Sequence, residues 1–227
     1  MEANLILDRL DQVDQKIRSR SILEHPFYVA WNKGELTREQ LQGYAEIYYP
    51  HVAAFPRYLE SAIASTEDPG IRAELEDNLR EELAVPKAHN ELWLDFAEGL
   101  GLDREVVEAR SDRELETVET FDRLTRSSTA SAIAALYAYE SQQPEVAALK
   151  AEGLRNFYGV EDSKTLGYFE VHAEADIRHR DGERKALGRC LASGATGEQA
   201  LQATGEALDA YWALLDDVCD ELGIEPS

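Results

Sequence analysis

Apolar residues recur along most of this chain with the 3.6-residue period of an α-helix. The first such segment covers residues 4–18, where leucine, valine and isoleucine side chains share one helical face. A short second helix is expected over about residues 25–32, ending near Gly34. No segment alternates convincingly between apolar and polar residues, as a half-buried strand would. The pattern therefore predicts an all-α protein.

Capping residues predict a long third helix. Thr37 and Gln40 have the spacing of a capping box, in which each side chain bonds the backbone N–H of the other residue. The helical pattern then continues to about residue 65. Pro50 and Pro56 lie inside this segment, and each should kink the helix because proline lacks a backbone N–H.

A fourth helix is predicted to begin at the Asp68-Pro69 pair, since aspartate caps helices and proline favours their first turn. We expect this helix to carry Glu82 and to extend toward His89. Pro86 lies between these two residues and should bend the helix there. Ideal helix geometry therefore describes the Glu82 and His89 pair less well than it describes an uninterrupted segment.

The remaining helices are expected between further caps, prolines and glycines. One is expected from Asp103 to about Arg126, one from Ser127 or Ser128 to about Glu140, and one from Pro144 to about Tyr158. Another begins at Asp162 or Ser163. Gly182, Gly194 and Gly197 separate the C-terminal helices, and the final helix covers residues 200–222. The chain has 227 residues, which suits one large helical domain over residues 1–227. The prediction is a single-domain bundle of seven to nine helices.

Composition narrows the possible partners. The formal net charge is −22, from 45 acidic and 23 basic residues. Such an acidic surface repels phosphate backbones and anionic lipids. Neither nucleic acid nor a membrane is therefore an expected partner. The longest apolar run is far below the roughly 20 residues of a membrane span, and the N-terminal segment lacks the pattern of a secretion signal. Cys190 and Cys219 are interpreted as reduced thiols of a cytoplasmic protein.

Three of the five histidines combine with three carboxylates at spacings that suit two metal ions. The six residues are Glu82, His89, Glu140, His172, Asp176 and His179. A helix advances about 100° per residue, so residues seven apart return to within roughly 20° of the same direction. His172, Asp176 and His179 consequently fall within an arc of about 60° on one helix face. Nitrogen and oxygen ligands without thiolate favour iron or manganese, and three ligands per metal leave positions open for oxygen chemistry.

The competing interpretation is that these are ordinary polar residues of an acidic bundle. A glutamate two turns from a histidine, such as Glu82 and His89, is common on surface helices. Spacing gives no support for including Glu140. Two histidines and an aspartate on one face are harder to explain in this way, because the chain has only five histidines. The triplet therefore favours a metal-dependent enzyme.

The segment YFEVHAEADIRHR, residues 168–180, resembles the third ligand-bearing helix of the haem-oxygenase-like dimetal oxidases. The nearest match is the CADD type, the para-aminobenzoate-forming proteins related to the PQQ-synthesis protein PqqC and the thiaminase TenA. The resemblance extends over about residues 24–181 and implies their helical fold. Family ligands follow the order E-x6-H, a lone Glu, then H-x3-D-x2-H, which the six residues match. Glu81 is an alternative to Glu82, but its spacing to His89 is one residue too long.

The same family carries tyrosines around the metals and a nearby lysine. Tyr28, Tyr44, Tyr139 and Tyr168 occupy corresponding places, and Lys150 matches the family lysine. The resemblance implies that a tyrosine side chain of the protein becomes the ring of para-aminobenzoate, a folate precursor, with the lysine as proposed amine donor. Tyr28 is the first candidate for the sacrificed ring and Tyr44 the second.

The resemblance also implies the conditions of this reaction. The expected cofactors are two metal ions, Fe/Fe or Mn/Fe, which act with O2 and an external reductant. The protein would release a small-molecule product, act once per chain and form a homodimer. An amine is nucleophilic only when neutral, so Lys150 should be buried near the metals. Among the other tyrosines, those assigned only to packing are Tyr48, Tyr49, Tyr58 and Tyr211.

Other functions stay open on the sequence alone. A dimetal oxidase acting on an external fatty acid or amino acid would use the same six ligands. A thiaminase-like hydrolase would need a cysteine in the central cavity, whereas Cys190 and Cys219 follow the last ligand helix. A cofactorless oxidase of the PqqC type would carry basic residues where this chain has metal-type ligands. A non-enzymatic interaction protein is a further alternative, and nothing in the sequence supports it.

Overall fold

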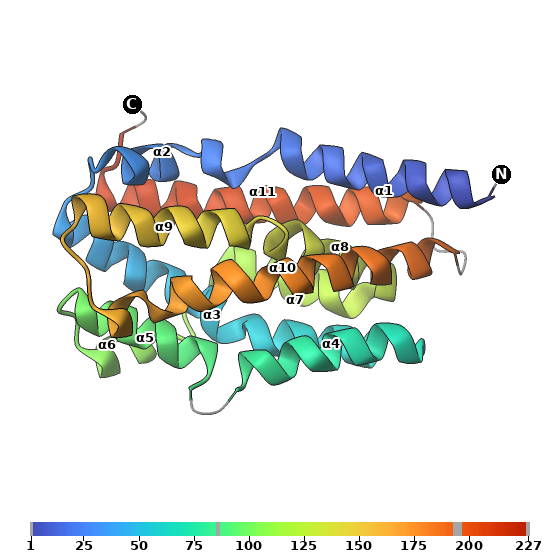
Figure 1. The fold of residues 1–227 in the computed structure, drawn as a ribbon, viewed down its shortest axis with the longest axis horizontal. Coiled ribbons are helices and arrows are strands. Elements are labelled where there is room, and N and C mark those ends of the chain that lie inside the picture. Colours follow the sequence, from blue (N-terminus) through green and yellow to red (C-terminus); the bar gives the residue numbers. More distant parts are fainter. Residues whose placement is uncertain (1, 85–86, 193–196, 226–227) are drawn as a thin grey trace.

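The structure is a computed structural model that describes residues 2–84, 87–192 and 197–225. Within these ranges it contains eleven α-helices, one short 3-10 helix and no strand (Figure 1). The elements are α1 (Glu2–Ser19), η1 (Ile22–Glu24), α2 (Pro26–Lys33), α3 (Arg38–Ser65), α4 (Pro69–Glu82), α5 (His89–Gly99), α6 (Arg104–Glu108), α7 (Glu116–Ser127), α8 (Thr129–Glu140), α9 (Gln143–Phe157), α10 (Ser163–Ala192) and α11 (Gly197–Leu222). The all-α prediction is confirmed.

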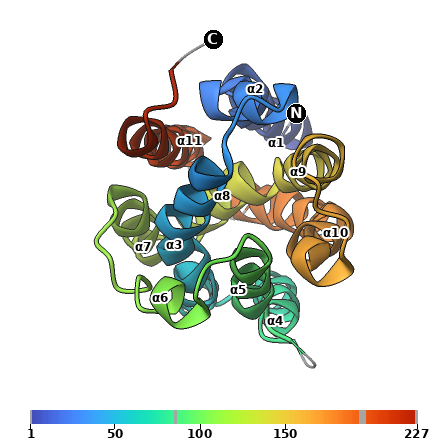
Figure 2. The same cartoon turned by 90° about the vertical axis from the view of Figure 1, so that its left-hand side faces the viewer.

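Helix α8 lies in the middle of the bundle, with the other long helices arranged around it (Figure 2). Every residue of α8 from Ala130 to Glu140 is buried. Five of these residues are alanines, whose small side chains let neighbouring helices approach closely. A helix that is apolar on all sides must be surrounded by protein. The position of α8 therefore brings Glu140, its last residue, into the interior.

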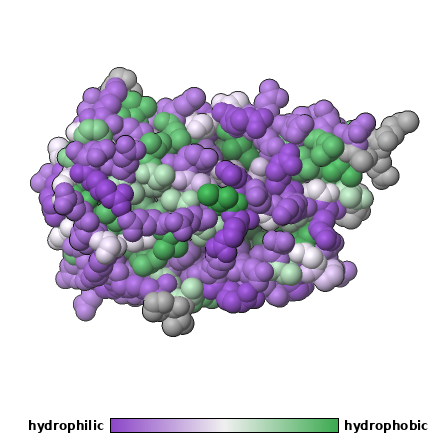
Figure 3. Space-filling model, viewed as in Figure 1, coloured by the Kyte–Doolittle hydropathy of each residue, from purple (hydrophilic) through white to green (hydrophobic). Residues whose placement is uncertain are grey.

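One continuous hydrophobic core joins the helices. It includes the large side chains of Trp31, Trp93 and Phe121, which are fully buried. Cys190 and Cys219 are also buried in it, and neither forms a disulfide within the described residues. Polar side chains cover most of the face seen in Figure 3, as the negative charge of the sequence requires. No helix in the described part of the chain is both long enough and apolar enough to cross a membrane.

Several predicted helix ends are confirmed. Thr37 and Gln40 make both hydrogen bonds of a capping box at the start of α3. The carboxylate of Asp68 accepts the N–H groups of Gly70 and Ile71 at the start of α4. Gly34 ends α2 with a φ of 71°, a left-handed conformation that favours glycine.

The predicted number of helices is too low for two reasons. The segment expected to run from Asp103 to Arg126 is divided into α6 and α7. The segment expected to carry both Glu82 and His89 is divided into α4, which ends at Glu82, and α5, which begins at His89. A proline at position 86 has no N–H to offer the Glu82 carbonyl, which gives a sequence reason for ending the helix. The bend expected at Pro86 itself lies outside the described residues.

Two other boundaries differ from expectation. Gly182 lies inside α10 and does not end it, because glycine costs a helix only about 1 kcal/mol and neighbouring packing compensates. Helix α3 includes Pro50 and Pro56 and is assigned as one helix over its whole length. The separation expected at Gly194 falls outside the described residues.

Removing the capping box should destabilise the protein without touching the core. Thr37→Ala should lower the free energy of unfolding by about 1 kcal/mol, because Gln40 loses its N-terminal acceptor. Chemical denaturation of the metal-free protein measures this change. Thr37→Ser is the matched control and should keep most of the stability, since it retains the hydroxyl. Equal losses in both variants would contradict the capping explanation.

Candidate metal centre

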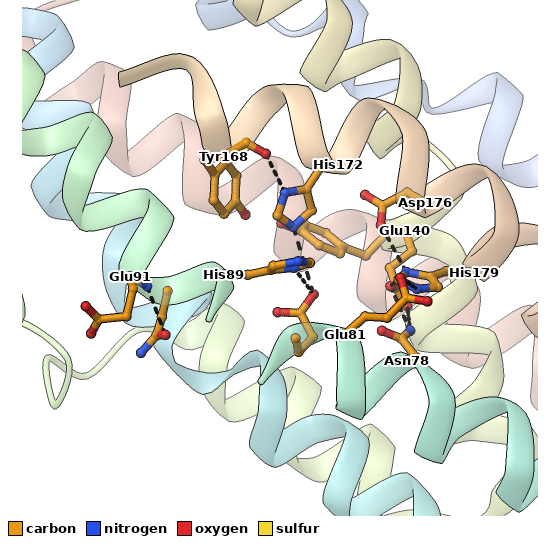
Figure 4. A network of polar contacts seen from close by, with 12 residues as sticks. Asn78, Glu81, His89, Glu91, Glu140, Tyr168, His172, Asp176 and His179 are labelled. Carbon is orange, nitrogen blue, oxygen red and sulfur yellow. Dashed lines mark hydrogen bonds and ion pairs between the residues drawn. The ribbon is translucent and has the colours of Figure 1, made fainter. Parts of the chain in front are cut away.

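Four helices bring the six predicted ligands together (Figure 4). Helix α4 contributes its last residue, α5 its first, and α8 its last, while α10 supplies the triplet. The six side chains form two buried groups of three, Glu82 with His89 and His172, and Glu140 with Asp176 and His179. In each group, one possible ligand atom from every residue lies within 4.8 Å of the others. Glu82 and His89 therefore meet through the packing of two helices and not by sharing one helix face.

The first group has two imidazoles turned toward one carboxylate. Nδ1 of His89 lies 2.8 Å from Oε1 of Glu82. Nε2 of His172 lies 3.9 Å from the same oxygen. His172 is held in this orientation because its Nδ1–H donates to the Tyr168 carbonyl at 2.7 Å. That bond fixes the tautomer and leaves Nε2 as the nitrogen available to a metal.

The second group has the opposite composition, with two carboxylates and one imidazole. Nδ1 of His179 lies 3.1 Å from Asp176 and 3.3 Å from Glu140. Its other nitrogen, Nε2, lies 3.2 Å from the Glu81 carboxylate. Asn78 donates to both oxygens of Glu140, at 2.9 and 3.1 Å. Glu81 thus occupies the supporting position behind a ligand, while Glu82 occupies the ligand position.

The donor set and the burial of this centre fit divalent cations. Among the described residues, the ion-pair partners of Glu82, Glu140 and Asp176 are all histidines, which are not permanently charged. Oδ2 of Asp176 is buried and has no hydrogen-bond partner in the described part of the chain. Burying carboxylates without permanent counter-charges is costly, and bound cations remove this cost. Imidazole nitrogens and carboxylate oxygens are suitable ligands for iron and manganese.

Burial sets the protonation of the metal-free centre. Burial and the charge of His89 lower the pKa of His172 to about 3, so its imidazole is neutral. Burial raises the pKa of Asp176 to about 7. Burial opposes the charged form of His179, but its hydrogen bonds to Asp176 and Glu140 outweigh this effect and raise its pKa to about 11. A metal entering the second group must therefore displace protons.

A cluster of aromatic rings extends from the metal centre into the core. The Tyr168 ring lies 4.1 Å from the His172 ring and 4.9 Å from Trp93, measured between centroids. The Trp93 ring stacks on Tyr48 at 5.1 Å. Lys150 Nζ lies 5.9 Å from the Trp93 ring. Contacts between rings therefore connect the centre to the lysine singled out by the sequence.

Lys150 is buried, as expected from the sequence. Its Nζ lies 4.8 Å from the ring of Tyr44, 5.0 Å from that of Tyr28 and 5.2 Å from that of Tyr48. It also donates a hydrogen bond to the Tyr44 hydroxyl. Burial lowers the pKa of Lys150 well below its usual value, which favours the neutral amine.

Two tyrosines assigned only to packing also belong to a polar network. The Tyr211 hydroxyl lies 3.4 Å from that of Tyr28 and accepts a bond from Gln143 at 3.2 Å. The Tyr48 hydroxyl lies 3.0 Å from that of Tyr139. Tyr48 follows Tyr44 by one helical turn, so its spacing could have indicated a shared face. Tyr211 comes from α11, beyond residues 24–181, over which the resemblance was drawn from the sequence.

Little open space remains where the metal centre faces the tyrosine rings, whereas a separate cavity of about 210 Å³ lies beside His179. A cavity of about 10 Å³ adjoins both ligand groups, and its walls include Tyr139 and Tyr168. This volume accommodates about one water molecule. On the side of Tyr139 and Tyr168, the space next to the centre is thus filled by the protein's own aromatic rings.

Comparison with known proteins identifies the family. Residues 42–212 match the family described as iron-containing redox enzyme. The chain belongs to this family. It is therefore an enzyme, and its two buried ligand groups are consistent with a dimetal centre.

Individual relatives agree with this assignment. The chain is 39% identical to the 4-aminobenzoate synthase of Chlamydia trachomatis, over 95% of this chain and 94% of that protein. It is 42% identical to the 4-aminobenzoate synthase of Chlamydia muridarum, over 91% of this chain and 88% of that protein. A haem-oxygenase-like domain from Shewanella denitrificans superposes with a TM-score of 0.74 at 19% identity, covering 96% of this chain and 94% of that one. The haem-oxygenase-like fold predicted from the sequence is confirmed.

Loss of one ligand should empty one half of the centre. His172→Ala removes the nitrogen that faces Glu82, so the metal content of protein loaded with ferrous iron should fall from two ions per chain to one or fewer. Elemental analysis of anaerobically loaded, desalted protein measures this. Glu170→Ala changes an exposed residue of the same helix and serves as the control, with unchanged metal content. Full loading of the His172 variant would remove this residue from the ligand set.

Metal affinity should rise with pH through the neutral range. In the metal-free protein, Asp176 holds a proton below about pH 7, and His179 holds one up to about pH 11. Binding must release these protons, so affinity falls as the solution becomes more acidic and falls more steeply below about pH 7. Calorimetric titration with Mn²⁺ in two buffers of different ionisation enthalpy counts the protons released. Binding without proton release would contradict protonation of Asp176 and His179 in the metal-free protein.

Proposed function

We propose that this protein is a 4-aminobenzoate synthase that builds its product from its own tyrosine side chain. The relatives that carry this name support the product. The origin of the product in the protein itself is supported by how the interior between the metal centre and Lys150 is filled. We call this part of the interior the chamber. Tyrosine rings and the Lys150 amine already occupy it, and only about 10 Å³ remains where Tyr139 and Tyr168 face the ligand groups.

The six ligand residues would hold two metal ions, as an Fe/Fe or Mn/Fe pair. Such ions, when bound, would supply oxygen-activating redox chemistry with O2 and an external reductant. The protein's own contribution is to fix the ligand geometry and to keep water out. His172 is oriented by the Tyr168 carbonyl, and the Tyr168 ring covers the imidazole face at 4.1 Å. This closed environment would protect reactive species from solvent.

The protonation states of the tyrosines and the lysine in the chamber suit oxidation of a phenol. Burial raises the pKa of Tyr28 and of Tyr44 well above the usual value, so both rings keep their protons. Losing an electron from a phenol is easier when its proton can move to a neighbouring group. The Tyr44 hydroxyl has the Lys150 amine as such a neighbour, and the Tyr28 hydroxyl has that of Tyr211. Tyr28 remains the first candidate for the consumed ring and Tyr44 the second.

The overall change can be written in terms of the bonds involved. The bond between Cα and Cβ of the consumed tyrosine breaks and leaves a glycine-like residue. The released Cβ is oxidised to the carboxyl carbon of the product, with O2 as oxidant. The Lys150 nitrogen forms a C–N bond to the ring carbon that carries the phenolic oxygen, and this oxygen leaves as water. Oxidation of the Lys150 Cε–Nζ bond by O2 to an imine, followed by hydrolysis, would free the nitrogen and leave an aldehyde at Cε. Because the ring and the nitrogen both come from the chain, each chain would complete one turnover.

An external fatty acid or amino acid is the alternative substrate for this fold. Either would need far more space than the roughly 10 Å³ beside Tyr139 and Tyr168, so this side of the centre would have to open first. The cavity of about 210 Å³ beside His179 is larger, but charged side chains line it, which does not suit a fatty acid. Homodimer formation and a cytoplasmic location remain expectations that accompany the proposal.

Isotope labelling distinguishes the internal source from an external one. Protein carrying ring-labelled tyrosine and ε-¹⁵N-lysine, given ferrous iron, O2 and reductant, should release at most about one doubly labelled 4-aminobenzoate per chain. Peptide mapping should find a glycine-like residue at position 28 or 44 and an altered Lys150. Tyr28→Phe and Tyr44→Phe identify the consumed ring. Tyr49→Phe is the control, because the Tyr49 ring is not among the aromatic rings around the Lys150 amine. Product without label, or repeated turnover, would reject the internal source.

A further inference from the structure

A fourth carboxylate lies beside the second ligand group. Glu183 follows His179 by one turn of α10, so it continues the face formed by His172, Asp176 and His179. The residue is only 4% exposed. Both of its carboxyl oxygens are buried and have no hydrogen-bond partner among the described residues. Neither the sequence pattern nor the family motif assigned this residue a role.

Glu183 is surrounded by the residues of the second group. It lines a cavity of about 210 Å³ together with Asn78 and His179, both of which contact Glu140. The negative charges of Glu140 and Asp176 act on it, and Glu140 lies within hydrogen-bonding reach. Two facing carboxylates without a donor between them repel each other, so either a shared proton or a cation must separate them.

No permanent positive charge of the protein satisfies Glu183 within the described ranges. The arginines of α10 pair with other carboxylates: Arg178 with Glu81, Arg180 with Glu145, Arg184 with Asp14 and Arg189 with Asp68. Lys150 is enclosed in the aromatic cluster and bonds Tyr44. A buried, unpaired carboxylate is costly, and this cost is removed either by a proton or by a positive ion close to the carboxylate.

The charge of the whole centre points to the same ion. Glu82, Glu140 and Asp176 supply three negative charges, one fewer than the four positive charges of two divalent cations. Glu183 supplies the fourth. The cavity that Glu183 lines also has Glu74, Asp77, Glu81 and Arg178 in its wall, so acidic side chains outnumber basic ones there.

We propose that Glu183 is a further metal ligand, binding the ion held by Glu140, Asp176 and His179. This inference rests on the metal centre of the proposed function and not on the identity of its product. The centre as a whole then has balanced charge, with four carboxylates for two divalent ions. The second ion receives three carboxylates and one imidazole, while the first receives one carboxylate and two imidazoles.

Glu183→Gln separates ligation from the alternative, a proton shared with Glu140. Glutamine has the same shape, and its N–H can replace the proton that a neutral Glu183 would donate to Glu140. It lacks the anionic oxygen that a ligand supplies. Glu74→Gln removes the same charge from an exposed residue in the wall of the same cavity and is the matched control. The measurements are Mn²⁺ stoichiometry and affinity, together with melting temperature with and without Mn²⁺.

If Glu183 is a ligand, Glu183→Gln should bind one ion per chain, or should bind the second ion with an affinity reduced more than roughly 100-fold. Residues that only support a ligand typically change metal affinity by roughly 10–100-fold. Burial and the neighbouring Glu140 raise the pKa of Glu183 well above its usual range, so this residue is neutral without metal and the metal-free variant should melt at about the wild-type temperature. Added Mn²⁺ should raise its melting temperature less. Glu74→Gln should match the wild type in all three respects.

Other results would overturn the proposal. Wild-type binding of both ions by Glu183→Gln would show a shared proton, and weakening within 10–100-fold would show a supporting role. A lower melting temperature without metal would show a packing role. A second variant, Glu183→Ala, should recover the second ion when formate is added but not with formamide; equal effects of the two additives would also reject ligation. If the wild type itself binds fewer than two ions, the proposed function fails as well; if only the variants behave unexpectedly, it stands.

Discussion

The structure depends on the burial of carboxylates that the protein alone does not neutralise. Glu82, Glu140 and Asp176 lie inside a helical bundle and, in the described ranges, form ion pairs only with histidines. Such an arrangement is unfavourable in an apolar interior unless cations complete it. The three carboxylates come from three different helices, α4, α8 and α10, so bound ions would join these helices through their ligands. Metal binding and the stability of the bundle are therefore expected to be coupled.

The same low-polarity interior has the opposite effect a short distance away. Beyond the Tyr168 ring, burial favours neutral forms, so Tyr28 and Tyr44 keep their protons and Lys150 tends to lose one. The interior thus contains a charged compartment for cations and a neutral compartment of rings and amine. Contact between the Tyr168 and His172 rings connects the two. An oxidation that begins at the ligands and ends on a phenol needs this arrangement of both compartments in one closed space.

The sequence predicts local features of this architecture better than tertiary ones. Caps such as Thr37, and the alignment of His172 with Asp176 and His179, depend on a few neighbouring residues and follow from helix geometry. Glu82 and His89 belong to different helices, so helix periodicity predicted their proximity for the wrong physical reason. Glu140 joins the centre because the central helix α8 ends there, which no spacing indicates. Tyr211 reaches Tyr28 only through packing of α11. The Glu183 carboxyl oxygens have no hydrogen-bond partner in the described ranges, and this is visible only in three dimensions.

Packing also explains why the proposed reaction would be used once. Tyr28 and Tyr44 are fully buried among aromatic neighbours, and Tyr44 alone contacts Phe27, Trp31, Tyr48 and Trp93. Truncating a large buried aromatic side chain costs about 3–5 kcal/mol, against a total stability of about 5–15 kcal/mol for a typical domain. Converting either tyrosine to a glycine-like residue would remove a comparable share of the core. The spent protein would lack the ring that it donated and much of the stability that kept its chamber closed. Under this proposal, the close packing that excludes an external substrate is the same feature that prevents a second turnover.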